Sequence, residues 1–413
     1  MPEKVYLVDQ PAYDTREIRA KVRRVFEQSA FNPRARSVLV KPSFVYPARA
    51  PKNLGVITQP ELIAGVAGAL KDLGARRVMV AEDSLLGPSE VAFVASGVLP
   101  HLRGLAEPLY LKKVERIKVT VRGPRVQEEF LVPKPWLDAD LFVSLPKIKV
   151  NMYAQVTLSV KNNLGLLLQE DRLLHHHYDL QKKIADLYKV RPPDFVIADA
   201  VVAGEAQGPM MAEPVHLGVL LAGKNGPAVD AVACHLMGFE PREIEHLRYV
   251  AEDGLGPIDL EEIELENGHL LQERKRRLRR PRVNLDDFPS DIHFHVGTEL
   301  ACGPGCVGMI RNSLDPWQKY GRLKSLAGFH FIVGKPVENL PADLPANRTI
   351  VFGDCAAPHR LRGTFLPGCP VTPLALTFTL ARKGKMAPLE TSLLDIGRGY
   401  LRHGLSRRRE AQR

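Results

Sequence analysis

Four of the five cysteines lie in the last 112 residues, in an arrangement that could hold a metal centre. Cys302 and Cys306 flank a Gly-Pro-Gly tripeptide, which would let the backbone wrap closely around a metal or a sulfide. Cys355 follows the strand-like segment TIVFGD, and Cys369 lies in LPGCP, where the proline after the cysteine is typical of ferredoxin-type binding segments. Four thiolates from two distant segments can bind a [4Fe–4S] cluster or a tetrahedral zinc ion.

The spacing of these cysteines leaves three alternatives open. The wide gap between Cys355 and Cys369 fits poorly with the close cysteine pairs of zinc sites, so we favour the cluster and keep zinc as the alternative. The third alternative is that the thiols bind no metal, because free cysteines are often small buried apolar residues. We expect that simpler role for Cys234, which lies inside the helical segment AVDAVACHLMG.

A second set of polar residues follows or interrupts strand-like segments in the N-terminal half. Lys41 lies in KPS, Lys147 and Lys149 lie in LPKIK, and Lys161 and Asn162 lie in SVKNN. If these segments meet at one edge of a sheet, they form a cationic pocket for a carboxylate or phosphate group. We therefore predict catalytic roles for Lys41, Lys147, Lys161 and Asn162, and a cofactor-binding role for Lys149.

Histidines and carboxylates complete the candidate site. His175, His176 and His177 are consecutive and cannot all point the same way, so we expect one of them, His176, to serve as an acid, a base or a ligand. An exposed histidine run is the alternative. Asp199 ends a strand-like segment and Asp230 lies in GPAVDAV, and we predict cofactor binding for both. For Asp230 the alternative is capping of a helix N-terminus.

The elements that would position these residues alternate between strand and helix. The segment SVLVKPS precedes a helical segment, PELIAGVAGALKDLGA, and the strand-like RRVMVAEDS follows it. Further strand-like segments are DLFVSLP, DFVIADA and VHLGVLLAG. This order predicts an α/β fold with a mostly parallel sheet and helices on both faces. In such sheets ligands bind beyond the carboxyl ends of the strands, where the lysines are expected.

The chain is long enough for two domains. A basic segment, residues 272–282, interrupts the strand and helix pattern, so we predict a boundary near residue 285. Residues 1–285 would form the larger α/β domain, and residues 286–413 a smaller α/β domain that carries the four cysteines.

Composition excludes several classes of protein. The chain is 45% hydrophobic and 25% charged, and no apolar stretch approaches the roughly 20 residues of a membrane-spanning helix. The N-terminal segment lacks the apolar region of a secretory signal, so we expect a cytoplasmic protein. The formal charge of +10 comes from ten basic residues in residues 274–282 and 407–409, which favours a solvated linker and tail over nucleic-acid binding.

An ordered set of segments resembles the domain-of-unknown-function family 362. These segments span roughly residues 35–265 and are KPS, VMVAEDS, LPKIK, SVKNNLG, the histidine run, IADAVVAGEAQGP and AVDAVACHLMG. Members of that family often carry cysteine-rich iron–sulfur modules, which the resemblance implies for Cys302, Cys306, Cys355 and Cys369. The chain departs from the commonest arrangement because it lacks a ferredoxin-like C-x2-C-x2-C-x3-CP repeat, so two clusters are not expected.

These features together predict an iron–sulfur oxidoreductase or electron-transfer protein that acts on an anionic small molecule, with a redox partner protein. The alternative is a non-enzymatic metal- or cofactor-binding or maturation protein whose metal centre is structural. Enzymatic activity therefore stays open at this point.

Overall fold

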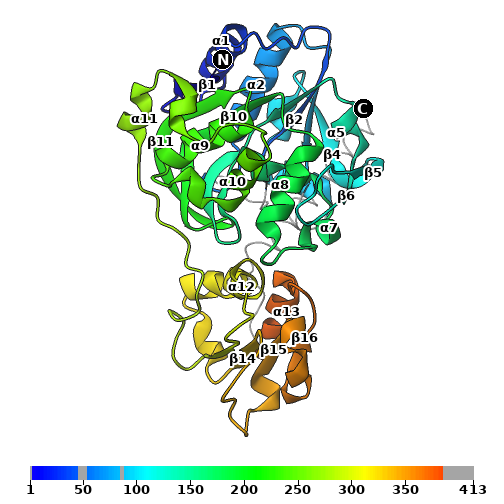
Figure 1. Cartoon of the computed structure of the whole chain (residues 1–413), viewed down its shortest axis with the longest axis vertical. Coiled ribbons are helices and arrows are strands. Elements are labelled where there is room, and N and C mark those ends of the chain that lie inside the picture. The colour runs from blue at the N-terminus through cyan, green and yellow to red at the C-terminus, as the bar shows by residue number, and fades with distance from the viewer. Residues whose placement is uncertain (1, 45–53, 84–87, 385–413) are drawn as a thin grey trace.

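The computed structural model describes residues 2–44, 54–83 and 88–384, and its main sheet has ten strands (Figure 1). Along the sheet the strands are β12 (Ile263–Glu266), β1 (Glu3–Asp9), β11 (Met211–Gly223), β10 (Phe195–Gln207), β7 (Leu141–Ser144), β2 (Ser37–Lys41), β3 (Arg77–Glu82) and β4 (Glu107–Tyr110), while β8 (Lys147–Asn151) pairs with β10 and β9 (Gln155–Thr157). The pairs β1–β11, β10–β11 and β8–β9 are antiparallel and the other pairs are parallel. The predicted mostly parallel α/β sheet is confirmed.

Helices cover both faces of this sheet, as the sequence predicts. Within β2 the side chains of Val38 and Val40 enter one apolar core and Leu39 enters the other, because successive residues of a strand point to opposite faces. Helices α1 (Thr15–Gln28) and α2 (Pro60–Asp72) pack on the first core. Helices α8 (Leu180–Val190) and α9 (Gly226–Leu236) pack on the second. Cys234 is fully buried in α9, as expected for an apolar role.

The remaining elements of this part surround the sheet. They are α3 (Ser89–Ser96), α4 (Leu99–Leu102), α5 (Lys134–Asp138), α6 (Ser159–Asn162), α7 (Gln169–Leu173), α10 (Glu245–Glu252), α11 (His269–Arg274) and the two-stranded ribbon of β5 (Arg116–Thr120) and β6 (Glu129–Pro133). Lys161 therefore lies in a short helix, where the sequence suggested a strand-like segment. Across the described ranges, every helix is too short or too polar to cross a membrane.

A second, fully parallel sheet forms the lower part of the molecule in Figure 1. Its strands are β13 (His293–Val296), β14 (His330–Val333), β15 (Thr349–Phe352) and β16 (Thr364–Leu366), in that order. Helices α12 (Gly308–Lys319) and α13 (Pro373–Gly384) accompany it and contact each other. Cys302 and Cys369 lie in loops of this region, Cys306 lies in a π-helical turn (Gly303–Val307), and Cys355 lies near the start of a 3-10 helix (Asp354–Arg362).

The apolar core on one face of the main sheet continues into this C-terminal region. Tyr153 packs so closely on the first turn of α12 that a Cβ on Gly308 would lie 2.7 Å from its ring. Gln207 at the end of β10 donates a hydrogen bond to Asp315 Oδ2 at 2.6 Å. Arg311 is almost fully buried and donates to Asp315 Oδ1 at 2.7 Å, which orients the carboxylate. Apolar packing and a satisfied ionic contact therefore hold α12 against the main sheet.

A buried carboxylate fixes the helix that carries Lys161. Asp230 in α9 is fully buried and accepts hydrogen bonds from the backbone N–H groups of Ser159 and Val160, each at 2.8 Å. These are the first residues of α6, whose preceding residue provides no side-chain cap. Asp230 thus caps a neighbouring helix, whereas the sequence suggested either a cofactor contact or a cap on its own helix.

Replacement of this carboxylate should destabilise the fold. We expect Asp230→Ala to lower the free energy of unfolding by about 3 kcal/mol, because two buried N–H groups lose their acceptor. Chemical denaturation followed by circular dichroism measures the change. Asp138→Ala, at an exposed carboxylate, is the control and should change stability by less than about 0.5 kcal/mol. Equal stability of the two variants would contradict this role for Asp230.

Candidate functional site

A cavity of about 280 Å³ lies between the main sheet and the C-terminal region. One wall contains the end of β2, strand β8, and helices α6 and α7, and the other contains α12 and α13. The predicted residues Lys41, Lys149, Lys161, Asn162 and His176 all line it. Five of the eight predicted catalytic and cofactor-binding residues therefore meet at one place, at the edge of the sheet where ligands of α/β folds bind.

Lysines form the polar part of this cavity. Lys41 is buried, and its Nζ atom donates to Glu82 Oε2 and to the carbonyl of Pro42, both at 2.8 Å. Lys149 is fully buried and its Nζ donates to the carbonyl of Val56, and no carboxylate of the described residues is bonded to it. Lys161 makes no hydrogen bond or ion pair with any side chain or carbonyl in the described ranges. Within the part of the chain that the structure describes, two of the three amines thus have no bonded carboxylate.

Arg172 adds a fourth cation that the sequence reasoning missed. Its Nη2 donates to the carbonyl of Leu167 at 2.8 Å and lies 3.8 Å from Asp83 Oδ2, while its buried Nε has no hydrogen-bond partner among the residues that the structure describes. The described lining residues include four such cations, Lys41, Lys149, Lys161 and Arg172, but two carboxylates, Glu82 and Asp83. The cavity therefore carries a surplus of positive charge and suits an anionic ligand.

Burial disfavours the charged forms of these groups. Desolvation lowers the pKa of Lys41 and lowers that of Lys149 well below its ordinary value, and neighbouring lysines add to the shift at Lys149. Desolvation, together with the charges of Arg172 and Lys41, lowers the pKa of Lys161 to about 8. A bound anion would reverse these shifts, because it stabilises the protonated amines.

Asn162 holds this edge of the sheet together. Its Nδ2 atom donates to the carbonyl of Lys41 and to Ser144 Oγ, each at 3.0 Å. The amide therefore links α6 to the ends of β2 and β7. Asn162 positions the backbone around Lys41 and Lys161, besides lining the cavity.

The other predicted residues lie elsewhere. Lys147 and Asp199 are fully buried and pair with each other at 3.0 Å, and Tyr13 Oη contacts both at 2.8 and 2.7 Å. Neither residue lines the cavity, and Asp230 caps α6 as described above. The structure thus gives Lys147, Asp199 and Asp230 partners within the protein.

His176 connects the cavity to the cysteine region. Its ring lines the cavity, and its Nδ1 lies 2.9 Å from the carbonyl of Pro304, between Cys302 and Cys306. Burial lowers the pKa of His176 to about 4, so its imidazole is neutral near pH 7. A neutral ring that donates from Nδ1 keeps Nε2 as a hydrogen-bond acceptor.

The four cysteines come from three neighbouring turns. Cys302 and Cys306 flank the turn before α12, while Cys355 and Cys369 follow the adjacent parallel strands β15 and β16. A hydrogen bond to Cys302 and burial raise the pKa of the Cys306 thiol, and the charges of Cys355 and Cys369 raise it further. Burial raises the pKa of Tyr178, and all four thiolates add to this shift. The four thiols are therefore close enough to interact electrostatically.

Two glycines make room for these sulfurs. A Cβ on Gly305 would collide with Cys302 Sγ, and a Cβ on Gly353 would lie 2.9 Å from Cys306 Sγ. Gly353 also has a φ of 87°, a conformation that favours glycine. The backbone around the thiols thus has the close approach that a metal-binding loop requires.

The spacing of the sulfurs bears on the kind of metal that could fit. A tetrahedral zinc ion with bonds of about 2.3 Å needs sulfurs about 3.8 Å apart, whereas a four-iron cluster spaces its cysteines more widely. Among the side chains described, the one set of three or more metal-ligand atoms that all lie within 4.8 Å is His175, His177 and Asp179. No three of the four sulfurs meet that limit.

Sequence comparison gives one family and one curated relative. Residues 38–235 match the family described as Domain of unknown function (DUF362). A thylakoid-associated protein of Synechocystis sp. is 25% identical over 277 residues, which are 63% of this chain and 83% of the relative. The chain is thus similar to DUF362 proteins over the part that contains β2, β8 and α6.

Two solved structures share low similarity with the chain. The lactate racemase apoprotein of Thermoanaerobacterium thermosaccharolyticum is 12% identical, with a TM-score of 0.37, over 80% of this chain and 69% of that one. A protein of Thermotoga maritima is 10% identical, with a TM-score of 0.38, over 80% and 74% of the two chains.

The pKa of Lys161 predicts how anion binding depends on pH. Lys161 is charged below about pH 8 and neutral above it, so sulfate, whose charge is constant in this range, should bind about tenfold more weakly at pH 9.5 than at pH 7. Equilibrium dialysis with labelled sulfate measures the affinity. The charged or titratable groups that act on this amine or share its field are Lys41, Lys149, Arg172, His176 and His246.

A pair of variants distinguishes a direct role of Lys161 in anion binding from a general effect of surface charge. Lys161→Met should bind sulfate weakly at both pH values and lose most of the pH dependence. Lys224→Met removes an exposed lysine outside the cavity and should behave like the unmodified chain. Sulfate binding that is equally strong in Lys161→Met would show that this amine does not contact the anion.

Proposed function

We propose that the chain is an iron–sulfur protein that binds an anionic small molecule beside its cluster and serves as an oxidoreductase or electron-transfer protein. Cys302, Cys306, Cys355 and Cys369 would hold one [4Fe–4S] cluster. Such a cluster supplies one-electron transfer at a potential that its hydrogen bonds and solvent exposure adjust. The residues of the cavity would bind and orient the anion.

The contact between His176 and Pro304 is the observation that carries this proposal. The His176 ring belongs to the wall of the cavity, and its hydrogen bond ends on the peptide between two of the cysteines. The anion site and the thiol site are therefore separated by one side chain and one loop. Short separation is what electron exchange between a cluster and a bound molecule requires.

The lysines would hold the negative groups of the ligand. Among the described residues, no carboxylate is bonded to Lys149 or Lys161, and the Nε of Arg172 has no acceptor. A carboxylate or phosphate group would provide acceptors for all three. The opposite wall is more apolar, with Met309 and Phe378, so an organic anion fits better than a fully hydrated ion.

A structural metal centre is the second candidate function. The thiols join the turn before α12 to the ends of β15 and β16, so a centre there would also link three segments of the small sheet. In that case the chain would be a cofactor-binding or maturation protein, and loss of the centre would unfold the C-terminal region without any redox signal. Reduction of the intact protein followed by electron paramagnetic resonance distinguishes the two.

Substitution of two glycines in one loop tests whether the four cysteines hold a cluster. Anaerobically purified protein should contain about four iron atoms and as much acid-labile sulfide per chain. Gly305→Ala should lose more than half of both, because its Cβ would collide with Cys302 Sγ. Gly303→Ala is the matched control, since a Cβ there meets no atom within 4 Å, and should retain both.

The melting temperature of the protein serves as the control for correct folding, and it should be the same in the two glycine variants. Colourless unmodified protein without iron or sulfide would refute the cluster. Stoichiometric zinc in its place would support the structural centre.

A further inference from the structure

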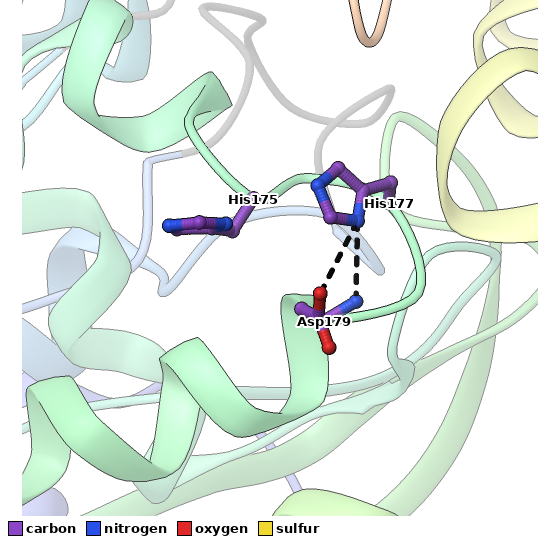
Figure 2. A group of neighbouring side chains, drawn as sticks. All are labelled: His175, His177 and Asp179. Atoms are coloured by element: carbon purple, nitrogen blue, oxygen red, sulfur yellow. Dashed lines mark hydrogen bonds and ion pairs between the residues drawn. The ribbon is translucent and has the colours of Figure 1, made fainter. Parts of the chain in front are cut away.

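The loop between α7 and α8 brings together a group of metal-ligand side chains outside the cysteine set. His175, His177 and Asp179 each offer one ligand atom, and these atoms all lie within 4.8 Å of one another. Figure 2 shows both imidazole rings on the loop that leads into α8, with His177 directed at Asp179. The two residues between them, His176 and Tyr178, interact instead with the cysteine region.

The backbone of this loop is shaped to bring the two rings together. His175 has a φ of 57°, in the left-handed region that residues other than glycine rarely adopt. The fully buried Lys183 holds the loop, because its Nζ donates to the carbonyls of Asp171 and Leu174, the latter at 2.5 Å. Such a clamped loop keeps its ligands in place before an ion arrives.

The side chain of Asp179 does not cap α8, although its position suggests that role. It immediately precedes α8, where an aspartate usually accepts hydrogen bonds from the first helical N–H groups, but its side chain makes no such bond. Its Oδ2 lies 3.8 Å from His177 Nδ1, and its Oδ1 accepts a hydrogen bond from Lys182 Nζ at 2.8 Å. The carboxylate thus faces the His177 imidazole, with Lys182 as a competing cation.

We propose that His175, His177 and Asp179 bind a divalent transition-metal ion of the zinc, cobalt or nickel type. Two imidazoles and one carboxylate are a donor set that such ions prefer over calcium or magnesium, which take oxygen ligands. Three protein ligands leave coordination positions open for water or a small molecule. All three side chains are partly exposed, so an ion can enter from solvent.

This site is independent of the cysteine centre proposed above. Its donors are nitrogen and oxygen atoms, whereas the cysteines offer sulfur. The two centres are neighbours, because the contact of His176 with Pro304 places the α7–α8 loop against the turn of Cys302 and Cys306. Either centre could be absent while the other is present, and their spectra differ.

Titration of the full chain with Co²⁺ tests the proposal under anaerobic conditions. We expect one Co²⁺ per chain with visible d–d bands and without the intense near-ultraviolet thiolate-to-cobalt band. His175→Ala and His177→Ala should each weaken binding at least about tenfold. His269→Ala, at an exposed histidine of α11, is the control and should bind like the unmodified chain.

A fourth variant should strengthen binding. Lys182→Met removes the cation bonded to Asp179 Oδ1, so Co²⁺ should bind a few-fold more tightly. A side chain with a merely structural role would not produce this gain. Absence of the d–d bands, or unchanged affinity in both histidine variants, would each overturn the proposal.

Discussion

The burial of cations at the carboxyl ends of the parallel strands is the constraint on which the rest of the site depends. Removing a charged ammonium group from water costs several kcal/mol unless a partner compensates it. Lys41 has Glu82 as its partner, but in the described ranges Lys149 bonds to one backbone carbonyl and to no carboxylate. The surrounding fold must therefore supply enough stability to hold these groups, and a ligand anion would complete their coordination. This explains why α6 is fixed so firmly from α9 and from the ends of β2 and β7.

The second wall of the cavity depends on how the C-terminal region attaches. Tyr153, Gln207 and His176 all belong to the larger part of the chain, and each contacts α12 or the turn before it. The apolar core runs through the same boundary. Because these contacts also fix the turn of Cys302 and Cys306, the cavity and the thiol site are built by one interface. A change that loosened this interface would disturb both.

The sequence predicted those features that follow from local pattern. Alternating apolar segments such as SVLVK predict buried strands, and a polar residue at the end of such a segment is expected at the sheet edge, where Lys41 lies at the end of β2. Lys149 lies within β8 and Lys161 in α6, so this pattern does not place them, although both line the cavity. Lys147 and Asp230 could not be judged in this way, because their partners Asp199 and Ser159 are 52 and 71 residues away. Arg172 lies in a short helix with no pattern around it. The boundary near residue 285, the cytoplasmic location and the redox partner stay predictions.

The basic segment shows why net charge alone could not locate the ligand. Four of its arginines form ion pairs with carboxylates: Arg274 with Asp9, Arg279 with Glu205 and Glu213, Arg280 with Glu243, and Arg282 with Asp287. Exposed pairs are individually weak because water screens them, but Arg274 and Arg279 link this segment to strands β1, β10 and β11 of the main sheet. Its charge is thus largely neutralised by the protein itself. In the cavity, by contrast, Lys149 and Lys161 form no ion pair with any described residue, so the positive charge most available to a ligand is charge that the chain has buried.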